Sequence, residues 1–261
     1  MTTNHSQMES VSSVPGGTPS DEVPGILATG RSGVTTIFAS MTSRHPQGRD
    51  AEYLRWHTFD HRPEQYRLPG LRSSLRLVST PACRATRAVS ADHYDAVDHI
   101  VTYFFADLAG LEVGRALTEE LQQAGRIPEM LPSVEAAVFR LEGISAAPRI
   151  KVGADVLPWW PSRGVYVLIE QGAAPAGDLA EVPGVGGVWW ASLAQLQVGL
   201  QPFDAEDQRQ LTYCFLDDDP VVVAAGLLTV LDDRWAGQKV VPLLAAPFHS
   251  VTGYDFDRHL P

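Results

Sequence analysis

The feature that most constrains the fold of this chain is a pair of short motifs that occur twice in the same order. The segment TYFFAD at 102–107 recurs as TYCFLD at 212–217, 110 positions later. The segment LPGL at 68–71 recurs as VPGV at 182–185, 114 positions later. Unrelated matches would rarely keep both their order and nearly the same spacing. The pattern therefore predicts that one structural unit was duplicated within the chain.

Hydrophobic periodicity and turn residues predict a similar order of elements in each half. The first half is expected to contain strands at 33–39, 71–79, 98–106 and 134–139, with helices at 49–66 and 111–124. The second half is expected to contain strands at 164–170, 186–193, 209–216 and 240–246, with a shortened helix at 175–181 and a full one at 219–235. The order β-α-β-β-α-β is that of the ferredoxin-like unit.

The expected fold class is α+β, with two tandem ferredoxin-like (βαββαβ) repeats packed as a pseudo-dimeric α+β barrel. We expect a disordered tail at 1–30, a first repeat at 31–143, a connector at 144–163 and a second, degenerate repeat at 164–261. Each sheet would have helices on one face and leave the other face apolar. Packing the apolar faces together would give a barrel interior able to hold a small ligand.

Composition narrows the classes of function. The chain has 261 residues and a formal net charge of −11, so it lacks the basic surface of a nucleic-acid binder. No apolar run approaches the roughly 20 residues that cross a bilayer, so no membrane partner is expected. Two cysteines, Cys83 and Cys214, fit a reducing cytoplasmic compartment. Formation of a homo-oligomer, where it occurs, is expected to use sheet edges or helices.

The region 50–71, DAEYLRWHTFDHRPEQYRLPGL, resembles the EthD-like family of the dimeric α+β-barrel superfamily. The shared pattern is Trp56, His61 five residues later, Pro63-Glu64, and Pro69-Gly70 before the next strand. The segment 103–105 also looks like the third strand of those domains. The resemblance covers about residues 33–140. The second half matches through the repeat and the expected fold alone, because it has no Trp…His-x-Pro-Glu equivalent.

The resemblance implies a pocket over the sheet, and members use that pocket for very different tasks. These tasks include decarboxylation and cyclisation of aromatic polyketides, isomerisation of lactones, quinone-forming monooxygenation, haem chemistry and undefined roles in xenobiotic breakdown. A shared fold does not choose among them.

Three titratable residues on the first predicted helix are the catalytic candidates: His57, Asp60 and His61. His57 and His61 are four residues apart and share a helix face. An imidazole exchanges protons near neutral pH, so His61 is a candidate general base that Asp60 or Glu64 could orient. The alternative is a structural corner in which His61 hydrogen-bonds to backbone. The sequence fixes no third metal ligand, no haem-attachment motif and no nucleotide-binding loop, so we expect no metal or cofactor.

Five aromatic or imidazole residues are candidates for substrate binding: Trp56, His99, Tyr103, Trp190 and Tyr213. Tyr103 and Tyr213 occupy matching places in the repeated motif, and a hydroxyl facing the interior could hold a carbonyl or phenol. His99 precedes Tyr103 by four residues and shares its strand face. Trp190 could form an aromatic wall. For each of these residues, ordinary core packing is the competing interpretation.

These observations favour a cofactor-independent enzyme that transfers a proton on a small, largely apolar, aromatic or polycyclic compound, as a lyase, isomerase or cyclase does. One alternative is a non-catalytic small-molecule-binding protein of a degradation or stress pathway. Another is an EthD-type or haem-dependent oxidoreductase.

Overall fold

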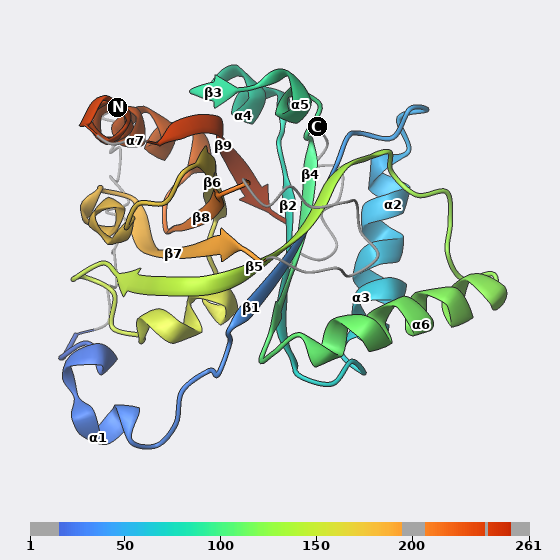
Figure 1. Ribbon diagram of the computed structural model, residues 1–261, viewed down its shortest axis with the longest axis horizontal. Coiled ribbons are helices and arrows are strands. Elements are labelled where there is room, and N and C mark those ends of the chain that lie inside the picture. Colours follow the sequence, from blue (N-terminus) through green and yellow to red (C-terminus); the bar gives the residue numbers. More distant parts are fainter. Residues whose placement is uncertain (1–15, 195–206, 238–239, 252–261) are drawn as a thin grey trace, which may run out of the picture.

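The computed structural model describes residues 16–194, 207–237 and 240–251, and these form a mixed α+β fold with one large antiparallel sheet (Figure 1). The order of its nine strands is β2-β4-β1-β5-β7-β8-β6-β9-β3, and a further pairing joins β2 to β9. The sheet therefore closes on itself. Its strands are β1 (Thr36–Thr42), β2 (Leu71–Val78), β3 (Val89–Ser90), β4 (His99–Phe105), β5 (Ser133–Ala146), β6 (Gly164–Gln171), β7 (Val185–Leu193), β8 (Arg209–Leu216) and β9 (Val241–Ser250).

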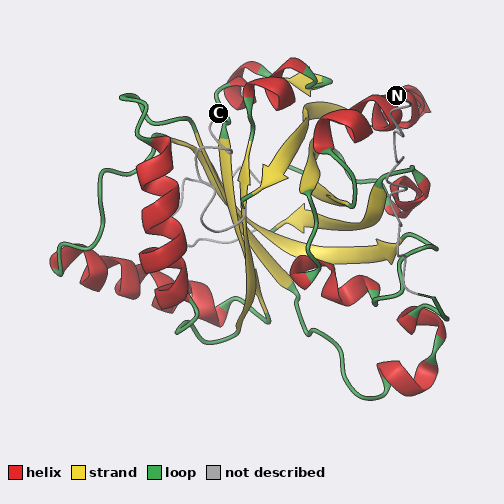
Figure 2. Cartoon of the chain, turned by 180° about the vertical axis from the view of Figure 1, so that it is seen from behind, coloured by secondary structure: helices red, strands yellow, loops and turns green. Residues whose placement is uncertain are grey.

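Helices cover the outer face of the sheet on two sides (Figures 1 and 2). Over β1, β2 and β4 lie α6 (Ala109–Gln123) and a helix formed by α2 (Asp50–Trp56), the π-helical turn η2 (His57–His61) and α3 (Arg62–Gln65). The second side carries α7 (Pro220–Gly237) and the 3-10 turn η4 (Gly177–Glu181). The remaining short helices are η1 (Ser20–Glu22), α1 (Pro24–Leu27), α4 (Pro81–Ala85), α5 (Asp92–Asp95) and η3 (Ala154–Trp159).

The two halves of the chain have the same spatial order of strands. In each half the second strand is followed by the third, the first and the fourth: β2-β4-β1-β5, then β7-β8-β6-β9. The halves meet along β5 and β7 and, through two residue pairs, along β2 and β9. Each long strand thus has a neighbour on both sides. Among the described strands, the two-residue β3 keeps an unpaired edge, and so does β2 at residues 71–75, because β2 pairs with β9 only at Leu77 and Val78.

Packed side chains fill the interior of the closed sheet. Because side chains alternate along a strand, every second residue points inward, and those residues are mostly large and apolar. Phe104 and Trp189 meet edge to face at 5.5 Å between ring centroids. The expectation that this interior holds the ligand was wrong for the described residues, because bulky side chains from both halves occupy it: Ile37, Met41, Ile100, Phe104, Phe139, Val167, Trp189, Tyr213, Phe215 and Phe248.

The repeated motifs differ in how well they mark equivalent positions. In both Pro-Gly turns the glycine has a positive φ, +75° at Gly70 and +87° at Gly184, and a strand begins at the next residue. The motif TYxFxD behaves differently. Tyr103 faces outward toward the helices, whereas Tyr213 faces the interior. The two tyrosines are therefore not equivalent in space, contrary to the sequence prediction.

The expected strands and long helices all form, and the differences lie in the connecting segments. Part of the expected tail is ordered against the segment expected as the connector, since Ser20 N–H donates to the Lys151 carbonyl and Ala154 N–H to Asp21, each at 2.9 Å. Residues 1–15 lie outside the described part. The expected connector contributes its first three residues to β5 and also forms η3. None of the helices in the described ranges has the length and apolar character that a membrane crossing needs.

Candidate functional site

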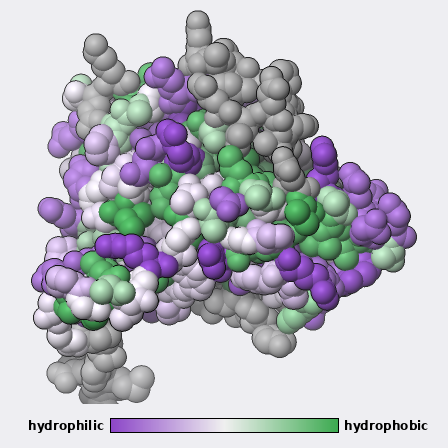
Figure 3. Space-filling model, turned by 60° about the horizontal axis from the view of Figure 1, so that its bottom comes forward, coloured by the Kyte–Doolittle hydropathy of each residue, from purple (hydrophilic) through white to green (hydrophobic). Residues whose placement is uncertain are grey.

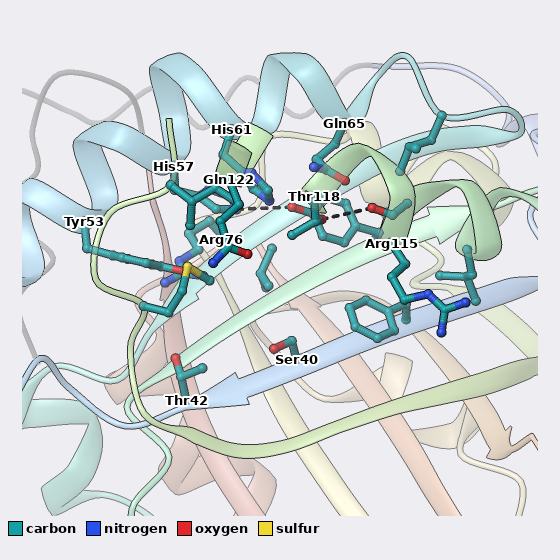
Figure 4. Close-up of a pocket in the computed structure, with 18 of the residues that line it drawn as sticks. Ser40, Thr42, Tyr53, His57, His61, Gln65, Arg76, Arg115, Thr118 and Gln122 are labelled. Atoms are coloured by element: carbon teal, nitrogen blue, oxygen red, sulfur yellow. Dashed lines mark hydrogen bonds between the residues drawn. The ribbon is translucent and has the colours of Figure 1, made fainter. Parts of the chain in front are cut away.

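A cavity of about 840 Å³ lies between the helices of the first half and the outer face of β1, β2 and β4. Figure 4 shows the side chains that point into it from the helix α2-η2-α3, from α6 and from the sheet below. Its apolar walls come from Phe38, Leu68, Val101, Phe105, Leu111, Ile127, Met130 and Val138. Met130 is half exposed, so the cavity reaches the surface. In Figure 3, strongly hydrophilic residues cover the right-hand end of the molecule, with hydrophobic residues beside them.

A local widening of the helix places two histidines over this cavity. The sequence predicted one uninterrupted helix at 49–66, and the structure contains a π-helical turn at His57–His61 inside it. The N–H of Arg62 bonds to the carbonyl of His57, five residues back. Pro63 follows and has no N–H to give to the carbonyl of Phe59, which removes an α-helical hydrogen bond. Such π turns inside α-helices frequently occur at functional sites.

His57 is fully buried beneath the helix. Its Nε2 and the Tyr103 hydroxyl share a hydrogen bond of 3.3 Å, while its Nδ1 has no partner among the described residues. Burial lowers the pKa of His57 well below its ordinary value, and the positive charge of Arg76 lowers this pKa further. The same burial raises the pKa of the Tyr103 phenol. At neutral pH this pair is therefore an uncharged imidazole and an uncharged phenol.

His61 lies beside His57, with 5.7 Å between the ring centroids. The indole of Trp56 stacks on the His61 ring at 4.8 Å, which fixes the plane of the imidazole. Burial lowers the pKa of His61 to about 4, although Asp60 acts in the opposite direction. Its Nδ1 finds no hydrogen-bond partner in the described structure. His61 therefore offers an uncharged ring at the cavity wall.

Three further polar residues line the cavity with unpaired atoms. Arg76 on β2 is 3% exposed, and its Nε and Nη2 have no partner among the described residues. Its guanidinium carbon lies 4.9 Å from the centre of the Tyr53 ring. Gln65 Nε2 and Thr42 Oγ1 are also buried and unpaired in that part of the chain. Unpaired buried polar atoms carry a free-energy cost, so their concentration here indicates a place for a polar ligand group.

Two of the predicted site residues support the cavity wall from outside. Asp60 forms an ion pair with Arg126, 3.1 Å between Oδ1 and Nη2. The Trp56 indole N–H donates to the Arg126 carbonyl at 2.7 Å. Arg126 leads into Ile127 and Pro128, which line the cavity. Asp60 therefore holds the segment that follows α6 and does not point at a ligand.

The remaining predicted binding residues lie elsewhere. His99 is buried under α2, where its Nε2 bonds to Asp50 Oδ1 at 2.8 Å. Tyr213 lies in the sheet interior, and its hydroxyl bonds to Thr102 Oγ1 at 2.7 Å. Trp190 packs on the outer face of the second half. The structure thus brings His57, His61 and Tyr103 into one site and leaves His99, Tyr213 and Trp190 outside it.

Sequence reasoning missed Arg76, Gln65 and Thr42, together with the polar residues Arg115, Thr118 and Gln122 that α6 turns toward the cavity. The sequence contains one indication that Arg76 is unusual, since it interrupts the otherwise apolar strand segment LRLV at 75–78. No group of three or more His, Cys, Asp or Glu side chains suited to a metal ion occurs among the described residues.

No protein-family model matches the chain, and no curated protein matches it. Solved structures do. A chlorite dismutase-like protein is 11% identical, with a TM-score of 0.50, over 87% of this chain and 100% of its own. An anthrone oxidase-like protein is 12% identical, with a TM-score of 0.46, over 85% of this chain and 94% of its own.

The neighbours are dimeric α+β barrel proteins. At this identity the likeness concerns the fold and not the activity. The EthD-like family assignment expected from residues 50–71 is not confirmed by these comparisons.

Proposed function

We propose that this chain is a cofactor-independent enzyme that moves a proton on a small, largely aromatic compound held in the cavity of the first half. The observation that carries the proposal is the pair of uncharged imidazoles, His57 and His61, at the wall of a cavity that combines apolar side chains with a few polar ones. A neutral imidazole can accept a proton, and low polarity around it strengthens its interaction with developing charge.

In the proposed step, a C–H bond next to a substrate carbonyl breaks and the proton moves to a ring nitrogen of His61. The electron pair shifts onto the carbonyl oxygen, giving an enolate, so no oxidant or reductant is needed. Developing negative charge beside the imidazole raises the pKa of His61 during the transfer. Trp56 positions the ring by stacking on it, and the Tyr103 hydroxyl with His57 can donate a hydrogen bond toward an oxygen. Return of the proton to another carbon would complete an isomerisation. Attack of the enolate carbon on a second carbonyl carbon of the substrate, with the proton passing from His61 to the resulting alkoxide, would complete a cyclisation.

We also propose that the fold is a tandem pair of ferredoxin-like repeats, 31–143 and 164–261, joined by 144–163 and packed as a pseudo-dimeric barrel. The identical strand order of the two halves supports this arrangement. A cytoplasmic location forms part of the same proposal and is supported by two free, buried cysteines.

The test is solvent deuterium exchange into aromatic carbon acids, followed by NMR. Benzoylacetone, 2-tetralone and anthrone are incubated in D₂O with the wild type, with His61→Gln, and with His93→Gln as a control that changes an exposed histidine outside the cavity. We expect the wild type and the control to accelerate exchange of at least one compound, and His61→Gln to lose about a hundredfold or more.

Exchange no faster than in buffer for all three compounds would overturn the proposal. Binding of the same compounds without exchange would instead support the alternative of a small-molecule-binding protein. A Soret absorption band in the purified protein would favour the haem-dependent alternative.

A further inference from the structure

The cavity holds a positive charge that no carboxylate balances. Arg76 lies on β2, and the ion pairs formed by the described residues do not include it. The buried carboxylate of Asp50, at the start of α2, already has partners in His99 and the backbone N–H of His45. Buried charges in proteins are normally paired, so an unpaired buried guanidinium indicates a missing anion.

The charge of Arg76 shifts the pKa values of the titratable groups around it. Arg76 lowers the pKa of His57, His61 and His99 and opposes the rise in the pKa of Tyr103. Arg76 lines the same cavity as His57 and His61, and Figure 4 shows its side chain among those that surround the cavity. The ring of Tyr53 contacts the guanidinium from one side, and Nε and Nη2 have no hydrogen-bond partner among the described residues. A guanidinium edge recognises paired oxygens of an anion especially well.

The position in the second half that matches Arg76 holds a tryptophan and, among the described residues, lines no cavity of this kind. Arg76 is the sixth residue after the glycine of the first Pro-Gly turn, and Trp190 is the sixth after the glycine of the second. Trp190 packs closely against Gly143 and Gly177, filling the outer face there. The first half instead places a cation at this position and leaves about 840 Å³ of space. The charge thus belongs to the half that keeps a cavity.

We infer that Arg76 recognises a negatively charged oxygen on the ligand, a carboxylate or an enolate, whose aromatic body lies against the apolar walls of the cavity. Gln65 Nε2, with two N–H donors, can add a hydrogen bond to that group, and the Thr42 hydroxyl can add another. The inference deepens the proposed function. It rests on that function in one respect, which is that this cavity is the ligand site. It assigns the ligand class: an aromatic anion, or an aromatic carbon acid that becomes one.

The first experiment compares a charged ligand with its neutral analogue by calorimetric titration at pH 7.5. The probes are 2-naphthoate and 2-naphthamide, which differ in charge and little in shape. The proteins are the wild type, Arg76→Met, Arg76→Lys, and Arg72→Met as a control that removes an exposed arginine from the same strand. The second experiment follows the enolate absorption of benzoylacetone at the same pH with the same proteins.

We expect the wild type and Arg72→Met to bind 2-naphthoate about tenfold or more tightly than 2-naphthamide, since a hydrogen bond to a charged group contributes about that much. Arg76→Met should lose this preference while binding 2-naphthamide as before, and Arg76→Lys should retain part of it. An increased enolate fraction with the wild type, absent with Arg76→Met, would identify the enolate as the recognised form. A preference for 2-naphthoate alone would identify a carboxylate.

Equal binding of the two naphthalene compounds by the wild type, together with no change in the enolate fraction, would overturn the inference even if Arg76→Met did not fold. The result is independent of catalysis. Proton exchange without any preference for the anion would refute the role of Arg76 and leave the proposed function standing. A preference for the anion without proton exchange would refute the proposed function and leave the role of Arg76 standing.

Discussion

At the scale of single residues, the site depends on polar groups that the fold buries without pairing them. His57, His61, Gln65 and Arg76 each carry a buried nitrogen without a hydrogen bond among the described residues. Each such group reduces the stability of the folded chain. This cost is expected where structure serves function, because the same groups become paired when a ligand enters.

The lowered pKa of His61 predicts acid-sensitive stability. The unfolded chain binds a proton at a pKa of 6.5 and the folded chain at about 4, so the unfolded state binds more protons between these values. Stability should therefore be full above pH 6.5 and fall as the pH decreases toward 4, by on the order of 3 kcal/mol from this residue. His61→Gln should reduce the fall. Urea unfolding midpoints from pH 4 to 7 test this, and equal pH slopes for both proteins would contradict it.

At the scale of elements, the helix α2-η2-α3 is shaped by one proline. Pro63 lies where a regular α-helix would need an N–H for the Phe59 carbonyl, and the chain widens into a π turn just before it. The wide turn sets the directions of His57 and His61. The same turn that departs from the regular α-helix therefore positions the two candidate catalytic histidines.

Replacing Pro63 with alanine should separate stability from function. Pro63→Ala restores an N–H donor and a good helix former, so the melting temperature should stay equal or rise. The regular α turn that can then form would rotate His61, and binding of 2-naphthoate should weaken several-fold. Calorimetry and thermal unfolding measure the two effects, with Pro46→Ala in an exposed loop as the control. Unchanged binding would show that the π turn does not depend on Pro63.

At the scale of the whole molecule, the sequence predicted the elements better than the site. The strands and long helices appear where alternation and turn residues indicate them, because both signals are local. The cavity is not local. Arg76 resembles a solvent-facing residue of an amphipathic strand, and only the helices packed over β2 bury it. The two TYxFxD motifs match in sequence, yet packing turns Tyr103 toward the cavity and Tyr213 into the interior.

The hydrogen bond between Tyr213 and Thr102 joins the two halves inside the closed sheet, and its removal tests the division between core and site. Tyr213→Phe leaves the Thr102 hydroxyl buried without this partner, which should lower the free energy of unfolding by about 1–2 kcal/mol. The ligand cavity lies on the opposite face of β4, so binding of 2-naphthoate should stay within about twofold of the wild type. Tyr103→Phe changes the cavity side of β4. It should weaken the binding of 2-naphthoate and reduce the free energy of unfolding less than Tyr213→Phe does. Urea unfolding and calorimetric titration of both variants measure the pair. Weak binding by Tyr213→Phe with unchanged stability would place the ligand in the interior and refute the assignment of the cavity to the outer face.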